Sequence, residues 1–217
     1  MGNGFIVVVG AGPGLGAAVA HRFGGGGFGV GLVARDRLRL DAMAGELADR
    51  GVDASVADAD ITDEVALAAA VTRLAEGAGR VDVLHFNPSR FRHKDPLHLS
   101  VAELLDDVRL GVGGLLTSVQ AARPFMGPGS RVSATGSMAA DKPWHEAASL
   151  GVQKAALRNL VRSVDATLRG EGVRAMSLTV NGTLAAGTPF APDRVADALF
   201  HAVTSRGDWR VEVPYDG

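Results

Sequence analysis

The sequence lacks cysteine over its whole length of 217 residues. This absence excludes disulfides, thiolate nucleophiles and metal sites that use cysteine ligands. It also suits a reducing compartment, and we expect the protein to be cytoplasmic. Tyrosine is nearly absent too, because Tyr215 is the only one. Chemistry that needs a phenol therefore has a single candidate, close to the end of the chain.

The sequence also lacks an excess of either charge and lacks long apolar runs. Its formal net charge of −2 gives no electrostatic reason to expect nucleic acid or an anionic membrane as a partner. The first apolar run, Phe5–Val9, has no basic region before it and ends at Gly10. We therefore expect neither a signal peptide nor a membrane span. The six histidines are scattered without paired spacing, so we expect no metal site.

What the sequence has instead is an alternation of short apolar or β-branched runs with longer helical patterns. The expected strands are Phe5–Val9, Phe28–Val33, Asp53–Ala57, Val81–Phe86, Arg131–Ala134, Arg174–Thr179 and Trp209–Val213. The expected helices are Leu15–Phe23, Leu38–Arg50, Glu64–Glu76, Val101–Phe125, Ala147–Leu168 and Asp193–Val203. Several strands are apolar throughout, which favours a parallel sheet covered by helices on both faces.

This pattern predicts the α/β class, with a Rossmann-type doubly wound parallel sheet of about seven strands flanked by helices. There is no linker and no repeat, so we expect residues 1–217 to form one domain. Its ligand crevice should lie at the carboxyl ends of the strands. The run of four glycines at 24–27 is expected to end a helix.

The first expected strand runs directly into a glycine-rich turn and a helix. The residues of this turn are Gly10, Gly12, Pro13, Gly14, Leu15 and Gly16. Such glycine spacing allows a tight turn and a close approach of the backbone to a pyrophosphate, and the helix N-terminus that follows favours negative charge. In this context the turn predicts a dinucleotide-binding domain, although a plain strand–turn–helix connection has the same spacing.

The end of the second expected strand distinguishes two cofactors. An acidic residue there binds the ribose hydroxyls of NAD, but this chain has Arg35 first and Asp36 second. A guanidinium suits a 2′-phosphate better than a hydroxyl. We therefore expect NADP(H) as the preferred cofactor. Asp36 leaves NAD(H) open, and a solvent-facing loop arginine is the other interpretation of Arg35.

With these features in place, the sequence resembles the short-chain dehydrogenase/reductase family over nearly its whole length. The segment that begins at Asp60 is similar to the family's Asp-Val/Ile-Thr-Asp segment, which implies that Asp60, followed by Ile61, contacts the adenine. Thr62 would also serve as an ordinary helix N-cap. Asn87 matches the second Asn of the family's Asn-Asn-Ala-Gly motif, and the resemblance implies a place beside the adenosine.

The family's catalytic set of Asn, Ser, Tyr and Lys is matched only in part. Ser137 resembles the catalytic Ser, and Lys154 matches the Lys of Tyr-x-x-x-Lys. The resemblance implies that Ser137 polarises a carbonyl oxygen and that Lys154 holds the nicotinamide ribose. Leu150 stands at the Tyr position and Arg109 at the Asn position. Leucine cannot donate a proton, so another donor is needed or the site is inactive.

His145 is the candidate for a replacement proton donor, beside water and the substrate itself. It lies between Ser137 and Leu150, in a segment expected to border the substrate, and an unperturbed imidazole pKa of about 6.5 suits proton transfer. An ordinary loop histidine is the other interpretation. Ser149 points about 100° away from Leu150 on a helix, and Tyr215 would need a special tail path or a partner chain.

Two segments bear on the substrate. The cations Arg90, Arg92, His93 and Lys94 follow the fourth expected strand, where they would either attract an anionic substrate or form a solvated loop. Residues Thr183–Pro192 stand where the family carries a substrate-covering insertion, but they are few and hold no expected helix. The resemblance then implies an open site, or one that another subunit completes.

The leading hypothesis is a divergent NADP(H)-dependent short-chain dehydrogenase/reductase that transfers a hydride to or from a small carbonyl or alcohol substrate. One alternative is a catalytically silent dinucleotide-binding protein, such as a redox sensor or an inactive subunit. The third hypothesis is an enzyme that catalyses a non-redox reaction. The resemblance also implies a homodimer or homotetramer packed through the helices Val101–Phe125 and Ala147–Leu168.

Overall fold

Seven strands form one sheet in the order β3-β2-β1-β4-β5-β6-β7, and all neighbouring pairs are parallel. The computed structural model describes residues 4–205 and 207–217. The strands are β1 (Phe5–Val9), β2 (Gly29–Ala34), β3 (Ala54–Asp58), β4 (Val83–Phe86), β5 (Arg131–Ser137), β6 (Arg174–Val180) and β7 (Glu212–Tyr215). The predicted Rossmann-type sheet is confirmed, and its strand order reverses between β1 and β4.

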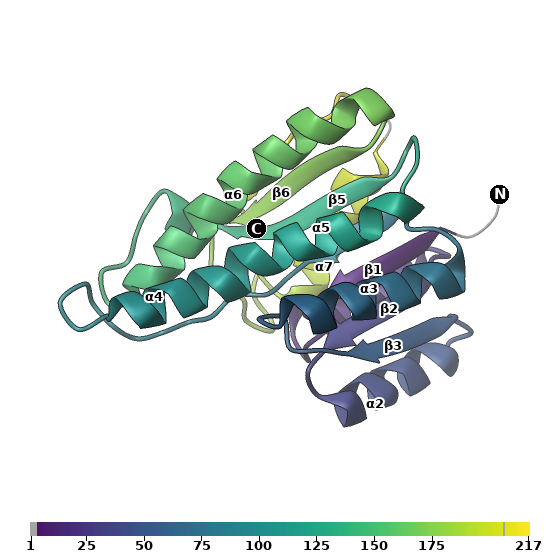
Figure 1. Ribbon diagram of the computed structural model, residues 1–217, viewed down its shortest axis with the longest axis horizontal. Coiled ribbons are helices and arrows are strands. Elements are labelled where there is room, and N and C mark those ends of the chain that lie inside the picture. The colour runs from purple at the N-terminus through teal and green to yellow at the C-terminus, as the bar shows by residue number, and fades with distance from the viewer. Residues whose placement is uncertain (1–3, 206) are drawn as a thin grey trace.

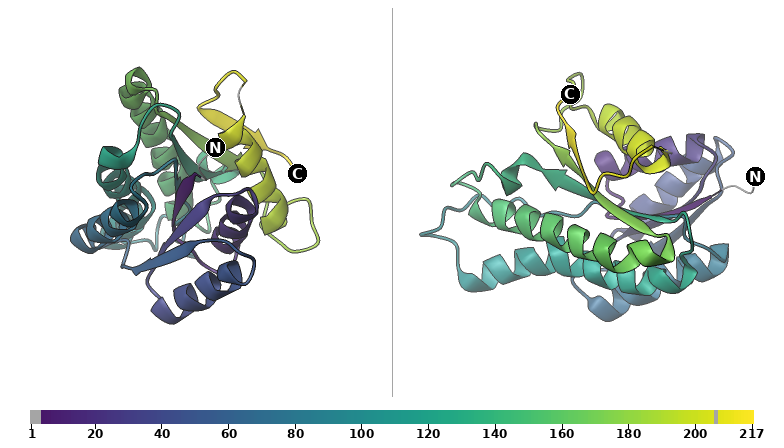
Figure 2. Two further views of the ribbon diagram at one scale, coloured as in Figure 1. Left: turned by 90° about the vertical axis from the view of Figure 1, so that its right-hand side faces the viewer. Right: turned by 90° about the horizontal axis from the view of Figure 1, so that it is seen from above.

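Helices cover the sheet on both faces (Figures 1 and 2). The α-helices are α1 (Leu15–Gly25), α2 (Arg37–Ala48), α3 (Glu64–Ala78), α4 (Val101–Val108), α5 (Gly114–Ala122), α6 (Ala148–Leu168) and α7 (Pro192–Thr204). Short helical turns are η1 (Arg109–Gly113), η2 (Arg123–Phe125), η3 (Met138–Ala140) and η4 (Arg169–Glu171). In the part of the chain described, no helix combines the length and the apolar character that crossing a membrane requires.

The central strand β1 explains why the apolar runs indicated a parallel sheet. Its side chains point alternately to opposite faces. Val7 and Val9 belong to the core beneath α3, α5 and α6, whereas Ile6 and Val8 belong to the core beneath α1, α2 and α7. All four are fully buried. A strand covered on both faces has no polar side to alternate with, so it is apolar throughout.

The helix expected over 101–125 is interrupted. It consists of α4, the π-helical turn η1, α5 and the 3₁₀ turn η2. Gly111 in η1 lies against α6, where a Cβ atom would stand 2.6 Å from Gln153 Oε1. Glycine therefore permits a close helix contact at this point. Such π turns within α-helices often occur at functional sites, and this one begins at Arg109.

Two predicted helix boundaries had different outcomes. The glycine run does end α1: Gly24 and Gly25 are its last residues and Gly26 is its C-cap, while Gly27 has φ +87°, in the region that glycine adopts without strain. Thr62 as the N-cap of α3 is wrong. The cap is Asp63, whose side chain accepts the amide of Ala66 at 3.0 Å, while Thr62 donates its hydroxyl to Asp60 at 2.7 Å.

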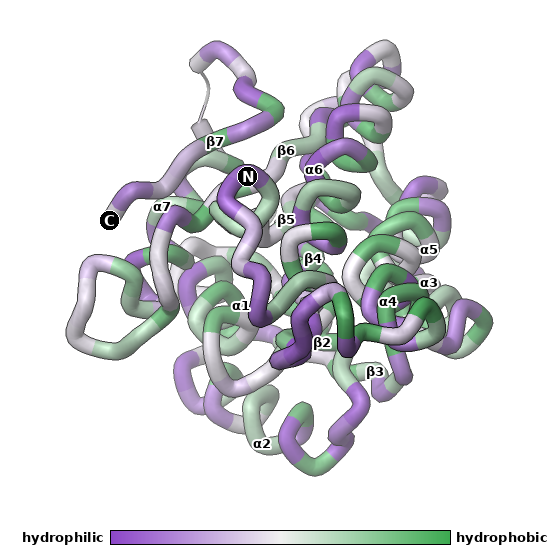
Figure 3. Tube along the Cα trace, turned by 90° about the vertical axis from the view of Figure 1, so that its left-hand side faces the viewer, coloured by the Kyte–Doolittle hydropathy of each residue, from purple (hydrophilic) through white to green (hydrophobic). Residues whose placement is uncertain are grey.

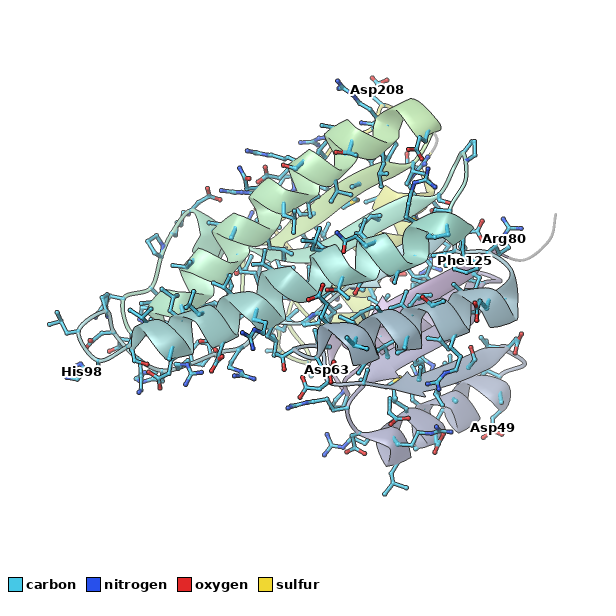
Figure 4. All side chains as sticks on the ribbon, viewed as in Figure 1. Asp49, Asp63, Arg80, His98, Phe125 and Asp208 are labelled. Atoms are coloured by element: carbon cyan, nitrogen blue, oxygen red, sulfur yellow. The ribbon has the colours of Figure 1, made fainter. Side chains whose placement is uncertain are left out.

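The carboxyl ends of all seven strands meet at one edge of the sheet, which is on the left in Figure 1 and faces the viewer in Figure 3. His98, in the loop before α4, projects at this edge, whereas Arg80 and Phe125 lie at the opposite edge (Figure 4). The loops that carry the predicted site residues follow the strands and so gather here.

Candidate active site

A cleft of about 450 Å³ opens at the carboxyl edge, beside the ends of β1, β2 and β4. It brings together the predicted cofactor residues Gly10, Gly12, Gly14, Leu15, Gly16, Arg35, Asp60, Ile61 and Asn87. Pro13 belongs to the same turn but is exposed and does not line the cleft. Ser137, Lys154 and His145 do not line it either.

The glycine turn has a shape that side chains would destroy. Gly10 has φ +86°, which L side chains rarely adopt. A Cβ atom on Gly16 would overlap the carbonyl oxygen of Gly10. Gly12 and Gly14 face open space, with nothing within 4 Å of a Cβ atom. The turn therefore folds tightly on one side and leaves its backbone accessible on the other.

The N-terminus of α1 differs from those of the next three helices. Asp36, Asp63 and Ser100 cap α2, α3 and α4 with their side chains, but α1 begins after Gly14 without a side-chain cap. Uncapped amides and the helix dipole favour a bound anion. Because Gly14 also lines the cleft, this end of α1 fits the pyrophosphate of a dinucleotide.

Charged residues mark the end of the cleft beside β2. Arg35 Nη1 lies 4.0 Å from Asp60 Oδ2, and the Arg35 side chain is 68% exposed. The amide and hydroxyl of Thr62, and more weakly Arg35, lower the pKa of the Asp60 carboxyl. Asp36 does not line the cleft: its side chain accepts the amide of Arg39 at 3.2 Å. Arg35 is therefore the charged residue after β2 that reaches this surface.

The floor of the cleft contains a set of hydrogen bonds around Thr135. Its hydroxyl donates to Asn87 Oδ1 at 2.9 Å, and Asn87 Nδ2 donates to the carbonyl oxygen of Gly10 at 3.2 Å. The Thr135 carbonyl oxygen accepts Lys154 Nζ at 2.8 Å. Thr135 itself lines the cleft, so Lys154 lies directly beneath the cleft wall.

Lys154 is buried without a counter-ion. It is 4% exposed, and within residues 4–205 and 207–217 no carboxylate forms an ion pair with it. Desolvation lowers the pKa of its ammonium group to about 8. A lysine in this environment changes its charge close to neutral pH.

Ser137 and Leu150 lie at the same edge as Lys154. Ser137 ends β5 and is half-buried, and its Oγ accepts the amide of Ala139 at 3.2 Å. Leu150 is half-buried in the first turn of α6, one turn before Lys154. Positions i and i+4 share one face of a helix, so Leu150 and Lys154 face the same way.

The other predicted proton donors lie away from the cleft. His145 is exposed and lines a second groove of about 490 Å³ with Trp144 and residues of α4, and the two grooves share no lining residue. The Ser149 hydroxyl donates to Asp107 Oδ2 at 2.7 Å. The Tyr215 hydroxyl donates to the carbonyl oxygen of Pro189 at 2.6 Å. Each of the two hydroxyl groups is thus committed to a structural contact.

The cationic loop after β4 is clamped by acids of α4. Arg92 forms a bidentate pair with Asp107, with both distances 2.9 Å, and Lys94 donates to Glu103 at 2.7 Å. Asp107 is fully buried, and hydrogen bonds from Arg92 and Ser149 lower the pKa of its carboxyl against the opposing effect of burial. Arg92 and Lys94 are thus paired with acids and are not free to attract an anion, whereas His93 of the same loop is exposed to solvent.

Sequence reasoning missed three residues that organise the site: His85, Asp107 and Thr135. His85 interrupts an apolar strand, and that interruption was a signal available in the sequence. Arg109 also behaves differently from a catalytic residue. It is exposed and lines a neighbouring groove with Thr62, Glu64 and Ile61, of which Ile61 also lines the cleft.

The sequence pattern of a family described as short chain dehydrogenase matches residues 4–193. The cis-4-hydroxycyclohexanecarboxylate dehydrogenase of Sinomonas cyclohexanicum is 30% identical over 215 residues, which cover 89% of this chain and 86% of that protein. The sulfoacetaldehyde reductase of Chromohalobacter salexigens is 29% identical over 177 residues, 80% of this chain and 70% of that protein.

A solved structure shares the fold closely. It is a short chain dehydrogenase from Burkholderia cenocepacia J2315 in complex with NADP, 25% identical to this chain with a TM-score of 0.89. The match covers 100% of this chain and 97% of that one. The seven-stranded sheet and its flanking helices thus recur in a protein that holds a nicotinamide dinucleotide.

Proposed function

The chain belongs to the short-chain dehydrogenase family, and from this membership we propose that it is an NADP(H)-dependent oxidoreductase. Its reaction would transfer a hydride to or from a small carbonyl or alcohol substrate. The observation that carries the proposal is the glycine-lined cleft, open at the uncapped end of α1, with Lys154 buried beneath its wall. That arrangement would combine a cradle for the pyrophosphate with a lysine that resembles the family's catalytic Lys.

The chain has residues for each part of the dinucleotide. The glycine turn and the first amides of α1 would hold the pyrophosphate, and Asp60, Ile61 and Asn87 the adenosine. Arg35 would bind a 2′-phosphate, and the capping role of Asp36 favours NADP(H) over NAD(H). When bound, the nicotinamide supplies or accepts the hydride.

Ser137 and Lys154 would orient the reactants. Because Ser137 Oγ accepts the Ala139 amide, its hydroxyl hydrogen is free to be donated to a substrate carbonyl oxygen. Lys154 would bind the nicotinamide ribose and place positive charge near the developing alkoxide. With Leu150 at the family's Tyr position, the proton would come from water or from the substrate, and His145 is a further candidate.

Leu150 also favours a second candidate function, a dinucleotide-binding protein without turnover. General acid–base catalysis contributes about 10²–10⁴-fold to a rate, so its loss would leave slow chemistry or none. Binding does not need the missing hydroxyl. A redox sensor or a silent subunit would therefore keep the glycine turn and Arg35 while tolerating leucine.

We also propose that α4, α5 and α6 pack against a second copy of the chain, giving a homodimer or homotetramer. Apolar side chains on these helices are exposed, among them Val101 at 73%, Leu105 at 60% and Val152 at 47%. Burial of these side chains in an interface would remove apolar surface from water. Sedimentation should give at least a dimer, and Leu105→Glu should shift it towards monomer.

The function is tested by following NADPH oxidation with a panel of small aldehydes and ketones, on the wild type, Ser137→Ala and Lys154→Met. Turnover that both variants reduce by at least about tenfold supports the proposal. NADPH binding without turnover on any member of the panel favours the silent protein. Consumption of a carbonyl compound without oxidation of NADPH favours a non-redox enzyme.

A further inference from the structure

A histidine lies inside the sheet beneath the cleft. His85 belongs to β4, between Leu84 and Phe86, and its side chain is fully buried. A polar ring in this environment is costly unless it is hydrogen-bonded. Both ring nitrogens have partners on β5: Nδ1 lies 3.0 Å from Ser133 Oγ and Nε2 lies 3.4 Å from Thr135 Oγ1.

The neighbouring hydrogen bonds determine where the ring proton lies. The Thr135 hydroxyl donates its only hydrogen to Asn87 Oδ1, so towards His85 it can only accept. His85 must then carry its hydrogen on Nε2, and Ser133 donates to the bare Nδ1. Burial, followed by the charge of Lys154, lowers the pKa of His85 to about 3. The ring is therefore neutral at ordinary pH.

This chain of hydrogen bonds connects His85 to the glycine turn of the candidate site. From His85 it passes through the Thr135 hydroxyl to Asn87, and from Asn87 to the carbonyl oxygen of Gly10 in the glycine turn. The same Thr135 holds Lys154 Nζ on its own carbonyl oxygen. One residue thus connects the floor of the cofactor cleft to the buried lysine.

The other end of the chain does not lead to solvent. Ser133 is fully buried, and in the described part of the molecule its side chain hydrogen-bonds to the His85 ring. Because the Ser133 hydroxyl has no contact with solvent, this end of the hydrogen-bond chain cannot exchange protons with water. The arrangement therefore fixes positions and does not conduct protons.

We propose that His85 and Thr135 are positioning residues that hold Asn87, Gly10 and Lys154 in the arrangement a nicotinamide dinucleotide requires. The inference rests on the proposed function, because an ordered site is useful only if the dinucleotide binds there. A site fixed before binding does not lose conformational freedom when the ligand arrives. An apolar residue at position 85 would fill the same strand without fixing Thr135.

The first test compares Thr135→Val with Thr135→Ser. Valine keeps the branched shape but removes the hydroxyl, whereas serine keeps the hydroxyl. NADPH titration should show binding weakened about fivefold in Thr135→Val and changed by less than about twofold in Thr135→Ser. Equal affinity in the two variants, with equal melting temperatures, would overturn the proposal.

The second test needs no cofactor and reads the histidine ring directly. Long-range proton–nitrogen NMR spectra of the full chain should show His85 as the Nε2–H tautomer, unchanged between about pH 8 and pH 5. Thr135→Val should shift its Nε2 signal and the side-chain amide of Asn87, and Thr135→Ser should restore both. An Nδ1–H tautomer would overturn the proposal.

The two tests distinguish this inference from the proposed function. If the wild type binds neither NADPH nor NADH, the proposed function fails. The NMR comparison then still decides whether the hydrogen-bond chain exists. If the wild type binds NADPH, and Thr135→Val and Thr135→Ser have equal affinities and equal melting temperatures, the function survives and the positioning role fails.

Discussion

The two ends of the candidate site differ in how closely they follow the family pattern. At the adenosine end, the glycine turn, Arg35, Asp60 and Asn87 all line one cleft and match residue types that bind dinucleotides. At the catalytic end, Ser137 and Lys154 are present, but Leu150 faces the same way as Lys154 and carries no proton. Under the proposed function, such a site would keep the groups that bind and orient the reactants while lacking its usual acid.

The buried charge in the loop after β4 and the buried charge beneath the cleft also differ in their partners. In that loop, buried Asp107 is neutralised by Arg92 and hydrogen-bonded by Ser149. Lys154 is buried, and among the residues that the structure describes its hydrogen-bond partner is the Thr135 carbonyl oxygen. A compensated pair is compatible with a purely structural role, whereas an uncompensated buried ammonium reduces stability. The role proposed for Lys154 in binding the nicotinamide ribose would account for its presence.

The largest effect should come from restoring a proton donor. Leu150→Tyr places a phenol one turn before Lys154, and we expect NADPH-dependent turnover of a small aldehyde to rise roughly 100- to 10,000-fold. Leu150→Phe is the matched control, because it adds the ring without the hydroxyl. A tyrosine variant no faster than the phenylalanine variant would contradict the assignment of position 150.

Replacing Asp107, the buried acid paired with Arg92, should strongly reduce stability. Asp107→Ala leaves Arg92 without its bidentate partner and Ser149 without its acceptor. We expect the free energy of unfolding to fall by about 3–5 kcal/mol, measured by urea denaturation. Asp106→Ala, at the neighbouring exposed acid, should change it by no more than about 0.5 kcal/mol. Similar losses in both variants would argue against a clamped loop.

Replacing Lys154, the buried cation without a counter-ion, should instead raise the free energy of unfolding. Burial lowers the pKa of Lys154 from 10.5 to about 8, so the buried charge reduces stability by up to about 3 kcal/mol at pH 7. Between about pH 8 and 10.5 the folded protein releases this proton before the unfolded one, and stability rises with pH. Lys154→Met should be more stable at pH 7 and lose this rise.

Lys142→Met, at an exposed lysine, is the control and should change stability at pH 7 by no more than about 0.5 kcal/mol. A Lys154→Met protein that is less stable than the wild type at pH 7, while Lys142→Met is neutral, would show that Lys154 stabilises the fold.

A further effect on stability appears at acidic pH. Because burial, and then Lys154, lowers the pKa of His85 to about 3, the unfolded chain binds a proton below about pH 6.5 that the folded chain does not. Stability should therefore fall with decreasing pH, by about 1.4 kcal/mol per pH unit between about 6.5 and 3. His85→Leu should have a shallower slope than the wild type.

His145→Ala, at an exposed histidine, is the control and should keep the wild-type slope. The same variant tests the remaining proton-donor candidate, since unchanged turnover would remove His145 from the mechanism. Parallel pH profiles for His85→Leu and the wild type would contradict a neutral buried ring.

The sequence contained enough information to predict the sheet and the glycine turn because both depend on local requirements. β1 is apolar since both its faces are covered. Gly10 is needed for its positive φ, and Gly16 because a Cβ atom there would overlap the Gly10 carbonyl oxygen. The surroundings of Lys154 could not be predicted in this way. Its partner Thr135 comes from β5, and the choice of partner depends on how β5 and α6 pack.

Proximity along the chain was also a poor guide at two positions. His145 is close to Leu150 in sequence, yet it lines the second groove with residues of α4. Arg109 begins a π turn that the helical pattern of 101–125 did not indicate, and Gly111 of this turn packs closely against Gln153 of α6. Long-range packing decided both positions.

The measurement that tests the central claim most directly is a fluorescence titration of the purified protein with NADPH and with NADH, alongside Arg35→Ala. We expect NADPH to bind more tightly than NADH, and Arg35→Ala to weaken NADPH binding about tenfold while NADH is unaffected. Arg50→Ala, at an exposed arginine beyond α2, should bind both as the wild type does. Failure of the wild type to bind either nucleotide would contradict the account.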